Sequence, residues 1–132
     1  MENQTNKEFQ EKKILIVEDD PYTNELISNL LATRGFNVIS VATGEEAVEY
    51  TKTHQPDLIV LDLLLPQIDG WEVTRILRMP GAKTLNIPIL ITSVLSRFDS
   101  VQNDKEILNL SFFSKPFESS DLVAEIERIL GG

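Results

Sequence analysis

Apolar and polar residues divide the chain into two alternating kinds of segment. Short apolar runs with high strand propensity predict strands at residues 14–17, 36–41, 58–61, 89–92 and 112–113. The segments between these runs carry apolar residues at helical spacing, which predicts helices at residues 21–34, 44–53, 70–78, 97–108 and 119–130. The pattern therefore predicts five strand–helix units in succession.

Residues that favour helix ends mark the boundaries of several of these helices. Asp20 is expected to cap the first helix, with Pro21 at its first position and Gly35 ending it. Thr43 is expected to cap the second helix. The apolar positions that define three of the helices are Leu26, Ile27, Leu30 and Leu31 in the first, Val73, Ile76 and Leu77 in the third, and Leu122, Val123, Ile126, Ile129 and Leu130 in the fifth.

This alternation predicts an α/β fold with a doubly wound five-stranded parallel sheet, covered by helices on both faces. The nearly continuous apolar runs at 14–17, 58–61 and 89–92 agree with strands that are buried on both sides. The regular spacing predicts a single domain over residues 13–132. Residues 1–12 are polar and lack a period, which predicts a flexible N-terminal tail.

Composition narrows the function further. The chain has 132 residues and no cysteine, which excludes disulfides, thiolate metal sites and thiol catalysis. No apolar run approaches the 18 residues or so of a membrane span, and no signal peptide is visible, so a cytoplasmic protein is expected. The net charge of −9 argues against direct binding of nucleic acid and favours the binding of a cation.

Polar side chains follow four of the five predicted strands. Glu18, Asp19 and Asp20 follow the first, Asp62 the third, Ser93 the fourth, and Lys115 the fifth. Each has an ordinary explanation when taken alone, because acids favour helix N-termini, an aspartate often follows a strand at a turn, and a lysine is usually solvated. Parallel sheets bring the carboxyl ends of their strands to one edge, however, where ligands bind.

Carboxylates that are packed this closely repel one another, and a divalent cation relieves the repulsion. Oxygen ligands alone favour Mg²⁺ over zinc or copper. Such a site suits phosphoryl transfer, in which a carboxylate can be the nucleophile. Asp62 is the natural candidate for that nucleophile, with Lys115 and Ser93 in contact with the phosphoryl oxygens.

Four motifs, in order and at matching intervals, resemble the receiver domain of response regulators from two-component signalling. They are ILIVEDDP at 14–21, DLIVLDLLLPQIDGWE at 57–72, IPILITS at 87–93 and KPF at 115–117. The resemblance covers residues 13–130. It implies a flavodoxin-like (βα)5 fold of the CheY-like superfamily, with strand order 2-1-3-4-5.

The resemblance also implies a role for each site residue. Asp62 is the phosphoacceptor, and it holds Mg²⁺ together with Asp19, with Glu18 acting mainly through water, and with the backbone carbonyl of Leu64. Lys115 contacts the phosphoryl group.

The same resemblance extends to the switch and to the loops around the site. Ser93 is the switch hydroxyl, and Phe112 is the switch aromatic that changes rotamer. The Lys115–Pro116 bond is expected to be cis. Pro66 and Gly70 shape the loop after the acceptor, and Asp20 stays a helix cap.

The sequence departs from the family pattern at several positions. Val94 replaces the small residue that usually follows the switch hydroxyl, residues 107–111 replace a common Gly-Ala, and Phe112 lacks the hydroxyl of the usual tyrosine. In the family, the side chains at positions 64 and 95 affect how the water that attacks the acyl phosphate is held. Both are leucine here, and we therefore predict slow autodephosphorylation.

The expected function is a signalling switch rather than an enzyme. A histidine kinase or phosphotransfer protein would dock near the first helix and phosphorylate Asp62. The surface formed by the fourth helix, fifth strand and fifth helix would then change and bind a downstream protein that the sequence does not identify. Two questions stay open: whether phosphorylation drives homodimer formation, and whether the chain is a full-length regulator or a fragment.

Two other functions compete with this one. An aspartate-nucleophile phosphatase or phosphotransferase acting on small molecules would usually carry a second aspartate two residues after the nucleophile, where this chain has Leu64, together with a cap domain. A degenerate receiver used only for binding disagrees with the complete set of acids, Ser93 and Lys115.

Overall fold

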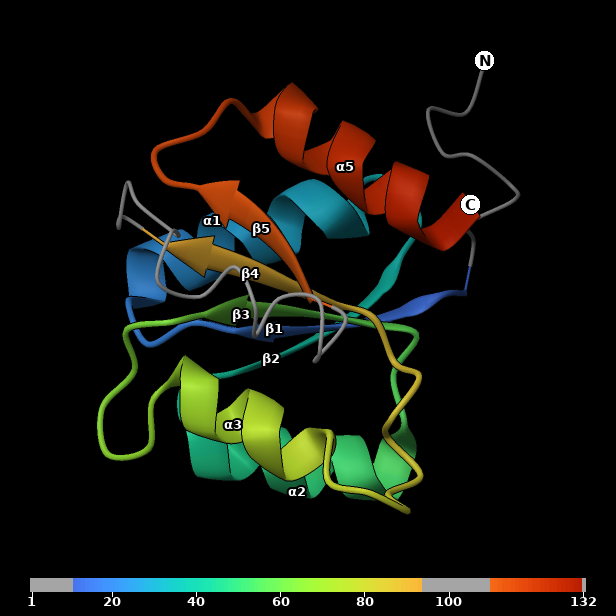
Figure 1. Ribbon diagram of the computed structural model, residues 1–132. Helices are drawn as coiled ribbons and strands as arrows, with labels where there is room; N and C mark the ends of the chain where they lie inside the picture. The colour runs from blue at the N-terminus through green and yellow to red at the C-terminus, as the bar shows by residue number, and fades with distance from the viewer. Residues whose placement is uncertain (1–10, 94–109, 132) are drawn as a thin grey trace.

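A parallel five-stranded sheet lies at the centre of this computed structural model, in which residues 11–93 and 110–131 are described (Figure 1). Its order, β2-β1-β3-β4-β5, confirms the predicted doubly wound fold. The strands are β1 (Lys13–Val17), β2 (Asn37–Val41), β3 (Leu58–Asp62), β4 (Ile89–Ser93) and β5 (Leu110–Ser114).

Helices cover both faces of this sheet. The helices α1 and α5 lie on one face, and α2 and α3 lie on the other (Figure 1). Their bounds are Pro21–Ala32 for α1, Gly44–His54 for α2, Gly70–Leu77 for α3 and Ser119–Gly131 for α5. The fourth helix predicted at residues 97–108 lies outside the described residues, as do residues 1–10 of the predicted tail.

The burial of the strands follows their place in the sheet. Every residue of β3 and β4 is buried, and β1 is buried beyond Lys13, as the apolar runs predict. The edge strands β2 and β5 are more exposed. The two cores on either side of the sheet contain Ile14, Ile16, Ile27, Leu31, Leu122 and Ile126 on the α1/α5 side, and Leu15, Val17, Leu61, Val73, Leu77 and Ile91 on the α2/α3 side.

The last strand is longer than its apolar run. The sequence predicts only residues 112–113, but β5 begins at Leu110, which pairs with Ile89, and ends at Ser114, which pairs with Ser93. The polar residues continue the ladder because strand pairing uses backbone groups, whatever the side chain.

The predicted helix starts are confirmed. Asp20 caps α1 and accepts a hydrogen bond from the Thr23 backbone N–H at 3.0 Å, with Pro21 at the first position. Thr43 caps α2, and its side chain accepts a hydrogen bond from the Glu46 N–H at 3.1 Å. The cap of α3 is Asp69, which the sequence analysis did not identify.

The helix ends differ from the prediction by a few residues. The helix α1 ends at Ala32 rather than at residue 34. Beyond Ala32, the hydrogen bonds span three residues instead of four, from Arg34 N–H to Leu31 O and from Gly35 N–H to Ala32 O. Gly35 has a φ of 97° and ends the turn, as predicted. The helices α2 and α5 each extend one residue further, to His54 and Gly131.

The apolar positions predicted for the helices are not all buried. Leu26 is 47% exposed on α1, although its neighbour Ile27 is buried. Ile76 is half-buried, while Thr74 is buried on the same helix and donates to the Trp71 carbonyl at 2.7 Å.

Within the described part of the chain, no helix has the length and apolar character needed to cross a lipid bilayer.

Gly70 allows α3 to begin directly against the end of β3. Its N–H donates to the Leu63 carbonyl at 2.9 Å. A Cβ atom at this position would lie 2.7 Å from the carbonyl oxygen of Asp62 and 2.8 Å from the Cα of Leu63. A side chain here would therefore displace the backbone that carries Asp62.

Gly70→Ala is expected to lower the free energy of unfolding by about 1–3 kcal/mol, because the added methyl group must push the Asp62–Leu63 backbone aside. The same change at an uncrowded helical position stabilises a protein by about 0.4–1 kcal/mol. The sign of the change, measured by denaturant unfolding, is therefore the test. A variant that is as stable as the wild type or more so would contradict the close approach.

Candidate functional site

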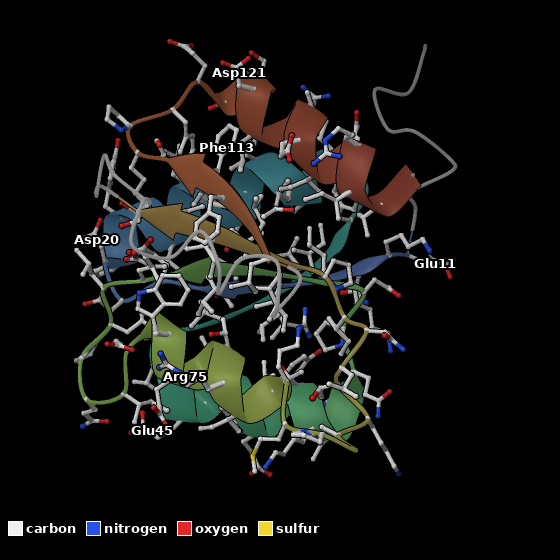
Figure 2. The ribbon with its side chains drawn as sticks, in the orientation of Figure 1. Glu11, Asp20, Glu45, Arg75, Phe113 and Asp121 are labelled. Atoms are coloured by element: carbon white, nitrogen blue, oxygen red, sulfur yellow. The ribbon has the colours of Figure 1, made fainter. Side chains whose placement is uncertain are left out.

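The polar strand ends gather at one edge of the sheet. Figure 2 places Asp20 at the end towards which the strand arrows point, and Glu11 at the opposite end. Parallel pairing produces this arrangement, since Val17 lies opposite Leu61 and Asp62 lies opposite Thr92. All four strand ends predicted to carry chemistry are thus delivered to the same edge.

Three carboxylates form a cluster at this edge. Glu18 and Asp19 follow β1, Asp62 ends β3, and each offers an oxygen within 4.8 Å of those from the other two. Glu18 and Asp62 are buried, whereas Asp19 is exposed. The structure therefore brings together the three acids that the sequence analysis singled out as ligands.

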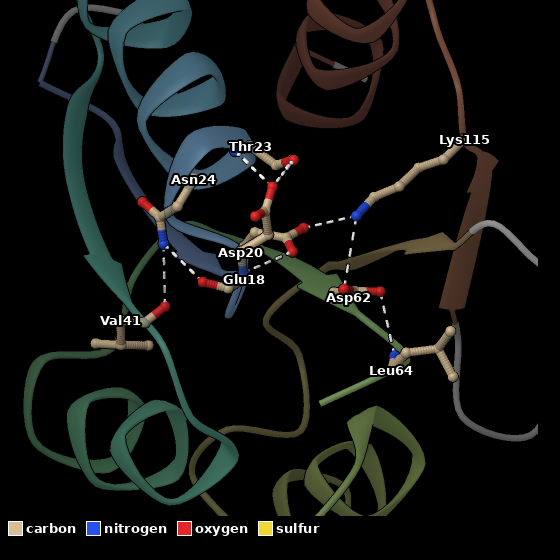
Figure 3. Close-up of polar contacts among 8 residues, drawn as sticks. All are labelled: Glu18, Asp20, Thr23, Asn24, Val41, Asp62, Leu64 and Lys115. Atoms are coloured by element: carbon tan, nitrogen blue, oxygen red, sulfur yellow. Dashed lines mark hydrogen bonds and ion pairs between the residues drawn. The ribbon is translucent and has the colours of Figure 1, made fainter. Parts of the chain in front are cut away.

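Lys115 reaches this cluster from the end of β5. Its Nζ lies 2.6 Å from Glu18 Oε1 and 3.5 Å from Asp62 Oδ2 (Figure 3). Its backbone N–H donates to the Ser93 carbonyl at 2.7 Å, which continues the pairing of β5 with β4 past the last strand residue. The Lys115–Pro116 peptide is cis, as predicted.

The backbone after β3 holds the Asp62 carboxylate in place. Asp62 Oδ1 accepts a hydrogen bond from the Leu64 N–H at 3.1 Å, and the Leu63 N–H donates to the Thr92 carbonyl at 3.2 Å. One carboxylate oxygen therefore faces a backbone amide and the other faces the ammonium of Lys115. The Leu64 side chain is 52% exposed.

Burial and nearby charges shift the titration of Glu18. Removal from water raises the pKa of Glu18 above its usual range, the hydrogen bond from Lys115 lowers it, and the neighbouring charge of Asp62 raises it again. The net effect is a raised pKa, as expected for carboxylates that share a crowded site.

Asp20 belongs to the helix rather than to the cluster. Its side chain accepts hydrogen bonds from the hydroxyl and the backbone N–H of Thr23, and these bonds hold the pKa of Asp20 below its usual value. Asp20 is also absent from the group of acids whose oxygens lie within 4.8 Å of one another. The carboxylate is thus used as an N-cap, in agreement with its predicted role.

Asn24, in α1, is a contact residue that the sequence analysis missed. Its Nδ2 donates to the carbonyl of Glu18 at 2.9 Å and to that of Val41 at 3.3 Å (Figure 3). A polar residue on a helix next to an acidic turn carries no distinctive sequence signal, and only the packing of α1 on the strand ends reveals the contact.

The two switch candidates lie on neighbouring strands. Ser93 is buried at the end of β4, one residue past Thr92, the partner of Asp62 in the sheet. Phe112 is half-buried in β5, and its ring packs on that of Trp71 at the start of α3, with the ring centres 5.9 Å apart and the planes tilted by 51°. Val94 and Leu95 lie outside the described residues.

The donor set fits a magnesium ion. Magnesium binds oxygen ligands at about 2.1 Å, so two ligands on opposite sides of the ion lie about 4.2 Å apart. The oxygens of Glu18, Asp19 and Asp62 have a spread of up to 4.8 Å, which suits two direct carboxylate ligands and a third that acts through water. All of these donors are oxygen atoms, which Mg²⁺ prefers.

Comparisons with known proteins agree with this geometry. The response regulator receiver domain family matches residues 14–127. The chain is 38% identical to the alkaline phosphatase synthesis transcriptional regulatory protein of Bacillus subtilis, over 90% of this chain and 48% of that protein. The chain thus spans about half the length of the curated relatives it matches.

Two solved structures of receiver domains from histidine kinases are also similar. The domain from Syntrophus aciditrophicus is 33% identical, with a TM-score of 0.78 over 92% of this chain and 91% of that one. The domain from a Pseudomonas aeruginosa sensor kinase is 28% identical, with a TM-score of 0.76 over 92% of this chain and 99% of that one, and it holds a magnesium ion in its active site cleft.

The sequence match spans most of the chain, and the strand order and the strand-end acids agree with it. This chain therefore belongs to the response regulator receiver domain family of two-component signalling.

Proposed function

We propose that residues 13–132 form a receiver domain that accepts a phosphoryl group on Asp62 and thereby changes a protein-binding surface. One observation carries the proposal. The buried Asp62 carboxylate clusters with Glu18 and Asp19, which can hold a metal ion, and lies 3.5 Å from the Lys115 ammonium, which can hold an anion. A histidine kinase or a phosphotransfer protein would supply the phosphoryl group.

Asp62 would act as the nucleophile. One of its oxygens attacks phosphorus as the bond between phosphorus and the donor's imidazole nitrogen breaks, and the imidazole leaves. The Leu64 N–H holds the other oxygen, which limits rotation of the carboxylate. Lys115 lies 3.5 Å from Asp62 and can move from Glu18 to the new phosphoryl oxygens.

Glu18, Asp19, Asp62 and the carbonyl of Leu64 would hold Mg²⁺, with Glu18 acting through water. When bound, Mg²⁺ neutralises negative charge on the phosphoryl oxygens as they approach the acids. The acids alone would repel such a group, since three carboxylates lie within 4.8 Å of one another. Together, Lys115 and a bound Mg²⁺ would offset the three negative charges that a phosphoryl donor otherwise meets.

A new dianion on Asp62 would draw in Ser93 and Lys115 and bias a two-state switch. Ser93 ends β4, and the Lys115 N–H is bonded to its carbonyl, so movement at one strand end reaches the other. Phe112 lies two strand positions before Ser114, the partner of Ser93, and would change rotamer. The altered surface would include β5 and α5 and would bind a downstream protein.

The first turns of α1 offer a docking place for the phosphodonor. Tyr22 is 75% exposed and Leu26 is 47% exposed, one helical turn apart. Both lie in the first two turns of the helix that follows the acidic turn at Glu18–Asp20, so a protein bound there would be close to the acid cluster.

Replacing Asp62 with asparagine is expected to abolish phosphorylation, because the amide is not a nucleophile for phosphorus. The assay is incorporation of phosphate from acetyl phosphate with Mg²⁺, followed by mass spectrometry of the intact protein. Asp20→Asn is the matched control, since asparagine caps a helix as well as aspartate does and Asp20 lies outside the acid cluster. An Asp62→Asn variant that gains phosphate at the wild-type rate would disprove the assignment.

Acidification is expected to weaken Mg²⁺ binding. The loss should begin at a higher pH than it would if Glu18 titrated as an ordinary glutamate. Metal binding needs ionised carboxylates, and the raised pKa of Glu18 means that this group takes up a proton before the pH has fallen to 4.5, the value for an ordinary glutamate. Affinity should therefore be full above the raised pKa and decline through it. Calorimetric titrations with Mg²⁺ across this window test the prediction. In Glu18→Gln this step should disappear, and an unchanged profile would contradict it.

Leu64→Asn is expected to shorten the lifetime of the acyl phosphate. A polar side chain beside Asp62 can hold the attacking water, and about 1.4 kcal/mol of such positioning accelerates hydrolysis about tenfold. The measurement is the rate of phosphate loss after the donor is removed. Leu85→Asn is the control, because Leu85 is similarly exposed but lies in the loop before β4, at the other end of the sheet. Equal half-lives for the wild type and Leu64→Asn would show that the apolar side chain of Leu64 is not what slows hydrolysis.

A further inference from the structure

We infer that Asn24 is a positioning residue that sets the Mg²⁺ affinity of this site by fixing the peptide between Glu18 and Asp19. The inference rests on the proposed metal site and adds to it a residue outside the acid cluster. In Figure 3, the contacts drawn for Asn24 run from its amide to the ends of β1 and β2, and none of them reaches Asp62 or Lys115.

The contacts of Asn24 join the backbone of Glu18 to the end of β2. Its Nδ2 donates to the Glu18 carbonyl at 2.9 Å and to the Val41 carbonyl at 3.3 Å. Glu18 N–H also donates to Val41 O at 3.1 Å. Both backbone groups of Glu18 are therefore bonded, one to β2 directly and the other to the side chain of Asn24.

The planarity of the peptide carries this restraint to both acids. The Glu18 carbonyl, the Asp19 nitrogen and the two Cα atoms lie in one plane. Rotation of that plane would turn the Glu18 and Asp19 side chains relative to each other. A hydrogen bond that holds the Glu18 oxygen therefore holds the relative direction of the two carboxylates.

Neighbouring residues hold the Asn24 amide in this orientation. Ser28 Oγ donates to Asn24 Oδ1 at 3.2 Å, which leaves Nδ2 to face the two carbonyls. The Asn24 backbone N–H donates to the Asp20 carbonyl at 2.9 Å, and the Asp20 N–H donates to Glu18 Oε2 at 3.2 Å. Both the backbone and the side chain of Asn24 therefore hold the first turn of α1 to the acidic turn.

Repulsion gives this restraint a consequence for metal binding. Three carboxylates lie within 4.8 Å of one another, and Lys115 contacts two of them, Glu18 and Asp62. Asp19 is exposed and would relieve repulsion by turning towards solvent. Magnesium demands nearly ideal octahedral geometry, so its affinity depends on Asp19 being held in place.

The test is Asn24→Leu, which keeps the branched shape of the side chain but removes its polar groups. Leucine also favours a helix more than asparagine does, so the control must carry the same change. Thermal unfolding over a series of Mg²⁺ concentrations gives the metal-free stability and the metal affinity separately, because bound Mg²⁺ raises the unfolding temperature by mass action. Asn29→Leu is the matched control, since Asn29 is exposed on the same helix.

We expect Asn24→Leu to raise the dissociation constant for Mg²⁺ about tenfold, the lower end of the range for residues that orient metal ligands. Phosphorylation from acetyl phosphate should need about tenfold more Mg²⁺ for half-maximal rate, with the same rate at saturation. Asn29→Leu should match the wild type in both. Ser28→Ala, which removes only the group that orients the amide, should shift the Mg²⁺ dependence in the same direction by a smaller factor, and it serves if Asn24→Leu does not fold.

Two results would overturn the inference. If Asn24→Leu, or Ser28→Ala where Asn24→Leu does not fold, loses stability without Mg²⁺ but binds the metal as tightly as the wild type, the residue supports only the fold and the metal site stands. If the wild type itself shows no Mg²⁺-dependent stabilisation, the proposed metal site fails, and the inference fails with it.

Discussion

The attraction between the Lys115 ammonium and the carboxylates of Glu18 and Asp62 offsets part of the negative charge at the edge of the sheet. Ninety-seven residues separate Lys115 from Glu18 along the chain, yet their charged atoms lie 2.6 Å apart in a largely buried setting. Removal of one partner from a buried ion pair costs about 3–5 kcal/mol, because the other charge is left without compensation. The site can therefore hold its acids together only while a cation faces them, whether this is the ammonium or a metal ion.

That constraint explains how the fold and the proposed chemistry depend on each other. Parallel strands with buried apolar runs deliver the ends of β1, β3, β4 and β5 to one edge, and the backbone around them is held by further contacts. Gly70 lets α3 start against Asp62, and Asn24 ties α1 to the acidic turn. A phosphoryl group on Asp62 would add negative charge where Lys115 is already shared between two acids. A redistribution of that ammonium is the simplest local event from which a switch could begin.

Much of this arrangement could be predicted from the sequence. The apolar runs at 14–17, 58–61 and 89–92 were sufficient to predict β1, β3 and β4, because strands buried on both faces leave a continuous apolar signal. Asp20, Pro21 and Thr43 predicted their helix starts for an equally local reason, since capping uses side chains next to the helix. The full length of β5, from Leu110 to Ser114, and the exposure of Leu26 were not predicted, because backbone pairing and helix packing decide them.

The sequence by itself determined which chemical groups end the strands, and their motifs and intervals identified the family. Order along the chain carries that information because each strand end is a local feature. Only the tertiary structure decided which of these groups make contact: that Lys115 lies closer to Glu18 than to Asp62, and that Asn24 holds the Glu18 carbonyl. These contacts depend on how the end of β5 and the first turns of α1 pack against the end of β1, and no local feature of the sequence specifies that packing.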